Sequence, residues 1–188
     1  MVTTASDDPI LQTVAEILEH EGYDAVALRE VARRSRTSLT TIYKRYSTRD
    51  ELILAALEAW MDTHRYAGVP DVRREPGESL YSVLMRLFRA IFEPWERHPA
   101  MLAAHFRARS GPNGRRLLRR GLDVVVPAAL ESLAGVDEQL IADLDVIVAN
   151  VVYGLLGRFA AGEIAISDVL PTIDRTVYRV TAGYETPR

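Results

Sequence analysis

Apolar residues recur along this chain at spacings of three and four residues, and no segment keeps up the apolar and polar alternation that predicts a strand. Glycine and proline interrupt the pattern and divide it into separate helices. The spacing predicts helices over residues 10–21, 28–35, 39–46, 49–66, 80–95, 101–108, 118–133, 146–161 and 169–180. The sequence therefore predicts an all-α protein of about nine helices.

The second and third predicted helices are short and lie on either side of a turn at residues 36–38. Ser38 or Thr37 supplies a hydroxyl that can cap the third helix. Apolar positions with helical spacing point inward from both helices, at Leu28, Val31, Ala32, Ile42 and Tyr46. This arrangement predicts a helix-turn-helix, in which the third helix enters a DNA groove.

The same segment is strongly basic, although the whole chain has a formal net charge of -3 and an isoelectric point of about 5.8. The segment contains one acidic residue, Glu30. Its basic residues are Arg29, Arg33, Arg34, Arg36, Lys44, Arg45 and Arg49. A local positive surface on an otherwise acidic protein is typical of a surface that meets phosphate. The alternative is a solvated helix face, and Arg33, Arg34 and Arg36 are predicted to supply only a long-range field.

The side chains on the outer face of the third helix suit a DNA groove. We predict base-edge contacts for Leu39, Thr40 and Lys44, with Ser38 as a further candidate. Phosphate contacts are predicted for Arg29, Tyr43, Arg45 and Arg49. Two alternatives stay open, because Tyr43 could instead pack on the first helix and Leu39 could be an ordinary surface leucine.

Residues 9–55 resemble the TetR family of transcriptional regulators. The resemblance rests on the helix at 10–21 followed by Gly22-Tyr23, on the run from Leu28 to Ala32, and on the run from Thr41 to Tyr46. Arg49 stands where the family usually has a lysine. The sequence departs from the family pattern at Arg36 in place of glycine, Ala27 in place of a hydroxyl cap, Thr40 in place of glycine, and Tyr46 in place of phenylalanine.

The resemblance implies a three-helix DNA-binding domain at residues 1–48 and a helical effector-binding and dimerisation domain at residues 49–188. About 135 residues after the motif are enough for a second core. The chain has no cysteine and no apolar N-terminal run, so the sequence predicts a cytoplasmic protein without disulfides or thiolate metal sites.

The segment at residues 146–161 is apolar or glycine except at Asn150 and Arg158. A helix that is apolar all round must be covered all round, and we predict that a second copy of the chain covers it. A membrane span is the alternative, but the segment is shorter than the roughly 20 residues that a span requires. The predicted dimer interface consists of Val148, Val151, Gly154, Leu155, Gly157, Ile173 and Val177.

The family resemblance also implies a small-molecule effector that binds among the helices after residue 49. Aromatic or polar residues on apolar stripes are the candidates for lining its pocket, namely Trp60, Phe88, Trp95, His105, Phe106, Asn150, Tyr153 and Arg158. Ordinary core packing is the alternative for each aromatic residue. The apolar lining favours a hydrophobic effector with one polar end, and the histidines lack the spacing of a metal site.

The sequence shows no nucleophile motif, phosphate-binding glycine loop or paired metal ligands, so we predict no enzyme activity and no cofactor. The predicted function is that of a regulator, most simply a repressor, that binds a palindromic DNA operator as a homodimer and is released by a small hydrophobic effector. Activation remains open. The alternative function is a helical interaction module that uses its basic helix for a protein partner.

Overall fold

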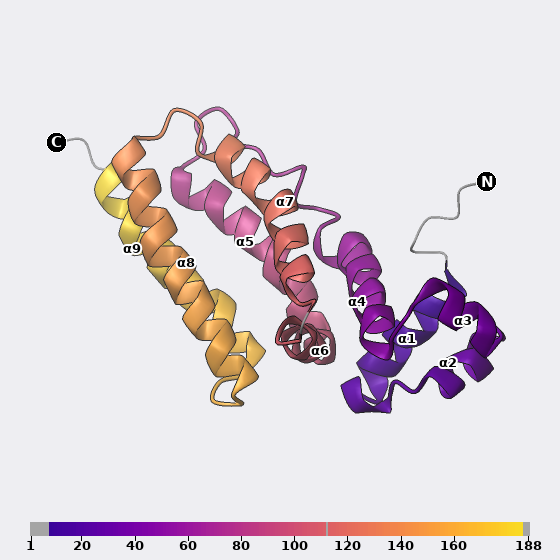
Figure 1. Cartoon of the computed structure of the whole chain (residues 1–188). Coiled ribbons are helices and arrows are strands. Elements are labelled where there is room, and N and C mark those ends of the chain that lie inside the picture. Colours follow the sequence, from indigo (N-terminus) through magenta and orange to yellow (C-terminus); the bar gives the residue numbers. More distant parts are fainter. Residues whose placement is uncertain (1–7, 112, 186–188) are drawn as a thin grey trace. The chain divides into compact units, whose positions relative to one another are not determined.

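The computed structural model describes residues 8–111 and 113–185, and within these residues the chain forms nine α-helices and no strand (Figure 1). The helices are α1 (Pro9–His20), α2 (Leu28–Arg34), α3 (Leu39–Arg45), α4 (Arg49–Trp60), α5 (Leu80–Arg97), α6 (Pro99–Arg109), α7 (Arg115–Ser132), α8 (Glu138–Ala160) and α9 (Val169–Glu185). Short 3-10 turns, η2 (Tyr23–Ala25) and η4 (Ile166–Asp168), precede α2 and α9, and a π-helical segment, η3 (Met61–Arg65), extends α4. The predicted all-α class is confirmed.

The helices group into two compact units. The first contains residues 8–67 and 98–122, in which α1 packs against α2, α4 and α6. Its core includes Val14, Ile17 and Leu18 of α1, all fully buried. The second unit contains residues 68–97 and 123–185, in which α9 packs against α5 and α8. The helices that bear the predicted DNA contacts therefore belong to the same unit as α4 and α6.

The first helix has a clear start and a clear end in the sequence. The Asp8 carboxylate accepts the Ile10 backbone N–H at 3.0 Å, and Pro9 occupies the first turn, where its missing N–H costs nothing. At the other end Gly22 adopts a φ of 87°, and its N–H bonds to the Ile17 carbonyl. These two signals fix the length of the helix on which α2 and α4 pack.

The turn between α2 and α3 requires a left-handed residue, and Arg36 takes that role with a φ of 53°. The N–H of Thr37 bonds to the carbonyl of Ala32, and the N–H of Arg36 bonds to that of Arg33. This is the Schellman pattern that glycine usually completes. The departure at Arg36 is therefore accommodated by a strained backbone rather than by a different turn.

Replacing Arg36 by glycine is expected to stabilise the protein modestly. Relief of the left-handed conformation gains about 1 kcal/mol, and the added freedom of glycine in the unfolded chain cancels part of it. We expect a net gain of roughly 0.5 kcal/mol, measured by urea unfolding at equilibrium. Arg36→Ala serves as the control, because alanine keeps the strained φ, and a gain of equal size in that variant would contradict the explanation.

Two later helices differ from their predicted bounds. α8 begins at Glu138, well before the apolar run, because Asp137 caps it by accepting the N–H groups of Gln139 and Leu140. With 23 residues, α8 is long and apolar enough to cross a membrane, so helix length does not exclude a span. α9 begins at Val169, as predicted, but continues to Glu185, beyond its predicted end at residue 180.

Candidate nucleic-acid interface

The start of α3 is fixed by a local hydrogen bond. Ser38 caps the helix by accepting the Thr41 N–H at 3.0 Å, and the two hydroxyls lie 2.8 Å apart. Ile42, which is fully buried, and Tyr46, which is 9% exposed, hold the inner side of α3 against the rest of the unit. The inward positions of the third helix are thus those that the apolar spacing indicated.

The opposite side of α3 faces solvent. Tyr43 is 58% exposed, Thr40 and Lys44 are also exposed, and Leu39 is half-buried at the first turn. An exposed phenol is unusual for a residue that packs on a neighbouring helix, so the packing alternative for Tyr43 does not describe this structure. A hydroxyl, a phenol, an ammonium group and an apolar tip therefore share one accessible face, which can donate hydrogen bonds to bases or to phosphate oxygens.

The basic residues around α3 differ in how far they are engaged within the chain. Arg29 is exposed on α2. Arg33 and Arg34 bond to Glu30, with Arg33 Nε at 2.9 Å from Oε2, and Arg34 also pairs with Glu21. The two arginine hydrogen bonds lower the pKa of Glu30 to about 2. Part of the positive charge of α2 is therefore neutralised locally, in keeping with a field rather than contacts.

Arg49 was predicted to bind phosphate, and the structure places it differently. Its Nε donates to the Val26 carbonyl at 2.6 Å, a second nitrogen donates to the Tyr23 carbonyl, and its guanidinium lies 4.9 Å from the centre of the Tyr23 ring. Arg107 of α6 lies 4.7 Å from the same ring and pairs with Asp24 through two bonds of 2.6 Å. Arg49 thus ties the start of α4 to the η2 turn.

Arg45 is also engaged within the chain, because its Nη2 donates to the carboxylate of Asp8 at the start of α1. The two residues are 37 positions apart, and neither belongs to a motif that would join them. Only the folding of the first unit, in which α2 packs against both α1 and α3, brings them together.

The predicted effector residues are divided between the two units. Trp60, His105 and Phe106 lie in the first unit, where Trp60 stacks on His64 with ring centres 4.9 Å apart. Phe88 and Trp95 lie in the second unit. Asn150, Tyr153 and Arg158 are exposed on α8, where Asn150 donates to the Val146 carbonyl and Arg158 pairs with Glu163 at 3.0 Å. These last three residues do not line an interior cavity of the single chain.

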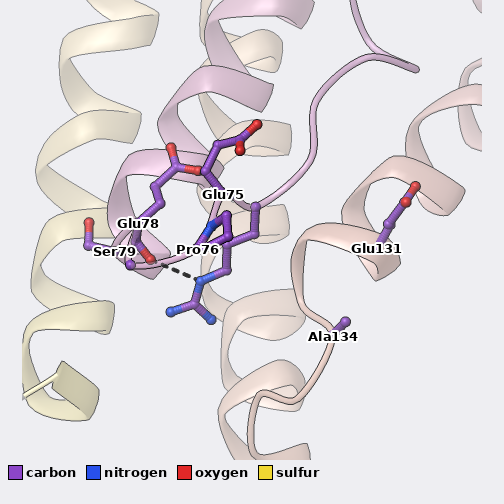
Figure 2. A pocket seen from close by; sticks show the side chains of 8 residues that line it. Glu75, Pro76, Glu78, Ser79, Glu131 and Ala134 are labelled. Carbon is purple, nitrogen blue, oxygen red and sulfur yellow. Dashed lines mark hydrogen bonds between the residues drawn. The ribbon is translucent and has the colours of Figure 1, made fainter.

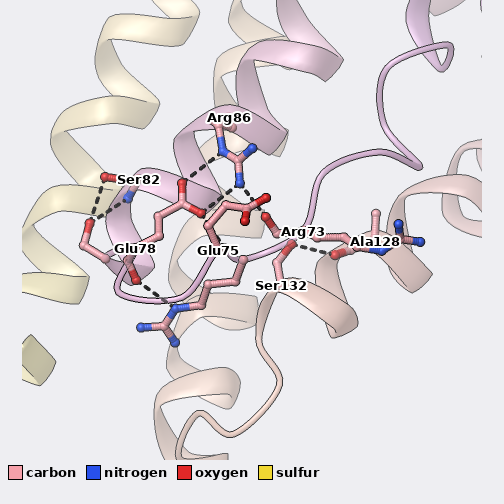
Figure 3. A network of polar contacts seen from close by, with 9 residues as sticks. Arg73, Glu75, Glu78, Ser82, Arg86, Ala128 and Ser132 are labelled. Atoms are coloured by element: carbon pink, nitrogen blue, oxygen red, sulfur yellow. Dashed lines mark hydrogen bonds and ion pairs between the residues drawn. The ribbon is translucent and has the colours of Figure 1, made fainter.

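A pocket of about 620 Å³ opens in the second unit, and none of the predicted effector residues lines it (Figure 2). Its walls are formed by Arg74, Glu75, Pro76, Gly77, Glu78, Ser79, Glu131 and Ala134. Arg86 donates to both carboxylate oxygens of Glu78 at 3.0 and 2.8 Å (Figure 3). Arg73 pairs with Glu131 at 2.7 Å. These contacts hold the segment before α5 against α5 and α7. The walls of the pocket are polar and do not fit a hydrophobic effector.

The predicted dimer residues separate into two groups. Val148 and Leu155 of α8, and Ile173 and Val177 of α9, are buried within the single chain, where α8 packs on α9. Val151 is half-buried, whereas Gly154 and Gly157 are exposed. The first four residues therefore form the core of one protomer, and a surface available to a second copy lies on the other side of α8.

Among the described residues, no three histidine, aspartate or glutamate side chains are placed to hold a metal ion. His64 and His98 do approach each other, with ring centres 5.9 Å apart, but His98 Nδ1 faces Glu19 at 3.2 Å. The two rings enclose Trp60 on α4, so they contribute to packing between α4, α6 and α1.

Comparisons with known proteins agree with this geometry. The chain is 42% identical over 50 residues to a DNA-binding transcriptional repressor TetR from Mycobacteroides abscessus, a match that spans 27% of this chain and 26%, or about a quarter, of that protein. Two solved TetR-type regulators from Rhodococcus sp. RHA1 share the fold with TM-scores of 0.61. They are 20% and 16% identical, and each match covers 95% of this chain and 98% or 96% of the other. A TetR-family regulator from Streptomyces coelicolor has a TM-score of 0.54 at 19% identity, over 95% of both chains.

Two family models match the chain along most of its length. Residues 10–56 match the model of the bacterial regulatory proteins of the tetR family, which covers α1 to α3 and the start of α4. Residues 77–180 match the tetracyclin repressor-like C-terminal domain, and that range is more than half of the 188 residues. The chain therefore belongs to the TetR family of transcriptional regulators.

Proposed function

We propose that the protein is a ligand-responsive transcriptional regulator that binds a palindromic DNA operator as a homodimer. The observation that carries the proposal is the exposed face of α3. Thr40, Tyr43 and Lys44 are all exposed to solvent there, and Ser38 caps the start of the helix. Leu39 and Ser38 flank this face at its start. Base contacts are assigned to Leu39, Thr40, Lys44 and Ser38, and phosphate contacts to Tyr43 and to Arg29 of α2.

Dimerisation is supported by the outer side of α8. Val146, Asn150, Tyr153 and Gly157 follow one another at helical spacing, and all are exposed, with Val146 at 62% and Tyr153 at 66%. No charged residue interrupts this run of α8, and only 17% of the most apolar window of the helix is buried in the single chain. A second copy related by a two-fold axis would cover this surface and present two copies of α3 to successive major grooves.

Effector control is supported by the way α4 is tied to the DNA-binding helices. Arg49 holds the start of α4 to the turn between α1 and α2, and Arg107 of α6 holds the same turn through Asp24. An effector that moves α4 or α6 would therefore move the helix-turn-helix with it. We retain a small hydrophobic effector as the proposed ligand, with its binding residues open.

Repression is the simplest regulatory outcome, and the curated relative from Mycobacteroides abscessus is a repressor. The proposal places the protein with DNA in the cytoplasm and assigns it no catalytic reaction. The division into a DNA-binding domain at residues 1–48 and an effector and dimerisation domain at residues 49–188 is part of the proposal.

Binding to fragmented genomic DNA at two salt concentrations tests the function. We expect enrichment of a discrete palindromic site, with affinity that falls steeply as salt rises because phosphate contacts release counterions. Tyr43→Ala and Lys44→Ala should each weaken binding by about tenfold or more, since a base or phosphate contact is worth roughly 1–3 kcal/mol.

Arg119→Ala is the matched control, because it removes an exposed arginine of α7 outside the proposed surface. An equal loss for Lys44→Ala and Arg119→Ala would indicate a general charge effect. A folded dimer that enriches no DNA site at either salt concentration would instead favour the alternative of a protein partner for the basic helix.

A further inference from the structure

The carboxylate of Asp8 contacts two different helices. Its Oδ1 accepts the Ile10 N–H at 3.0 Å and so caps α1. Its Oδ2 accepts the guanidinium of Arg45 and lies 3.4 Å from the hydroxyl of Tyr46, at the end of α3. One side chain therefore links the start of α1 to the last turn of the helix that we assign to the DNA groove.

Burial makes this link hard to exchange for another partner. The Asp8 side chain is only 7% exposed, whereas that of Arg45 is 47% exposed. A buried carboxylate that loses its cation remains in a low-dielectric surrounding without compensation, which is strongly unfavourable. The hydrogen bond that Arg45 donates to Asp8 raises the pKa of Arg45, and burial together with the nearby Asp8 charge raises the pKa of Tyr46. The arginine is thus held as a permanent partner of Asp8.

The link lies one turn from the groove-facing side chains. Arg45 and Tyr46 follow Tyr43 and Lys44 directly, and the Arg45 guanidinium also lies 5.4 Å from the centre of the Tyr46 ring. Ile42 is fully buried in the middle of α3. A polar contact at the end of α3 adds a second fixed point, which restricts rotation of the helix. Contacts to base edges depend on placement to within about 0.5 Å.

We propose that Asp8, Arg45 and Tyr46 form a positioning clamp that sets the orientation of α3 on the DNA, and that Arg45 acts through Asp8 rather than by binding phosphate. The proposal rests on the DNA-binding function proposed above. It assigns a role to Asp8, a residue outside the helix-turn-helix, and to the phenol oxygen of Tyr46. It replaces the predicted phosphate contact of Arg45.

The operator affinity of Asp8→Asn distinguishes a positioning role of Arg45 from a phosphate-binding role, because the two roles predict changes in affinity of opposite sign. Asparagine caps a helix as well as aspartate, so the start of α1 is kept while the ion pair is lost. A clamp predicts that affinity for the selected operator falls by about tenfold. A phosphate-binding Arg45 predicts the opposite, because the variant frees the cation and removes a negative charge from the DNA-binding surface.

The salt dependence provides a second, independent readout. Arg45→Ala should weaken binding without changing the slope of log affinity against log salt, whereas loss of a phosphate contact reduces that slope by about 0.9 for each contact. The double variant Asp8→Asn with Arg45→Ala should bind about as well as Arg45→Ala alone, because both changes break one interaction. Arg29→Ala is the control whose slope is expected to fall. A reduced slope for Arg45→Ala, or tighter binding by Asp8→Asn, would overturn the proposal.

Hydrogen exchange of the DNA-free protein tests whether the clamp fixes the end of α3, even if no operator is found. Asp8→Asn should speed the exchange of backbone amides in the last turn of α3 and leave those of α9 unchanged. Tyr46→Phe removes only the hydroxyl and tests the same contact if the Asp8 variant does not fold, with a smaller acceleration expected at the same amides. Unchanged exchange in α3 would contradict the clamp, whereas failure of the wild type to bind any DNA would contradict only the proposed function.

Discussion

Replacing Gly157 by leucine is expected to convert the proposed dimer to a monomer while the fold of each chain stays intact. A Cβ atom added at Gly157 meets no atom within 4 Å in the single chain, and Gly157 is exposed on α8, so the fold of one chain tolerates a side chain there. Leucine also favours the helix over glycine by roughly 0.5–1 kcal/mol. Any loss of assembly must therefore come from the surface between copies, where a glycine allows close approach of another helix.

Sedimentation equilibrium measures this outcome directly, and we expect the dimer dissociation constant to rise by about a hundredfold or more, in the range of overpacking costs of 1–3 kcal/mol at each of two symmetric contacts. Operator affinity should fall in parallel. Gly157→Ala is the graded control, since a methyl group needs far less room. A Gly157→Leu protein that stays dimeric would show that the α8 surface around Gly157 is not the interface.

The elements of this fold were accessible from the sequence because their signals are local. The cap at Ser38, the glycine at the end of α1 and the apolar positions of α3 each act within one or two turns. The exposed side of α3 follows from the buried side, so Tyr43 and Lys44 could be placed correctly. Short-range spacing in the sequence is therefore enough to predict the helix-turn-helix.

The partners of the arginines could not be predicted in the same way. Arg45 and Asp8 are far apart in sequence, as are Arg49 and the carbonyls of Tyr23 and Val26. A basic residue beside a recognition helix looks the same in sequence whether it meets phosphate or a carboxylate of its own chain. Long-range packing decides between these partners, and no local pattern encodes it.

The apolar helix α8 illustrates a different difficulty. Val148 and Leu155 turn toward α9, while Val146 and Tyr153 turn toward solvent, yet all four are apolar or aromatic. Helical periodicity identifies a buried side only when the other side is polar. Where both sides are apolar, one covered by the same chain and the other available to a second copy, the sequence predicts that a partner is needed without saying which side it covers.

His105 is one of the predicted pocket residues, and its burial also makes it a source of pH-dependent stability. It is 8% exposed on α6. Burial lowers its pKa from 6.5 to about 3, and the positive charges of Arg65 and Arg109 add to the effect. Below pH 6.5 the unfolded chain takes up a proton at this histidine, whereas the folded chain stays neutral until about pH 3. Its contribution to stability is therefore complete above pH 6.5 and is lost progressively as the pH falls toward 3.

The loss amounts to about 1.4 kcal/mol for each pH unit in this window, or roughly 2–3 kcal/mol between neutral pH and pH 4.5. His105→Gln removes the titrating group, so urea unfolding at the two pH values should show a smaller decline for the variant than for the wild type by that amount. The comparison concerns the pH dependence and not the absolute stability, which the substitution also lowers. An equal decline in both proteins would mean that His105 takes up its proton in the folded state, and that the interior of the first unit admits a charge at α6.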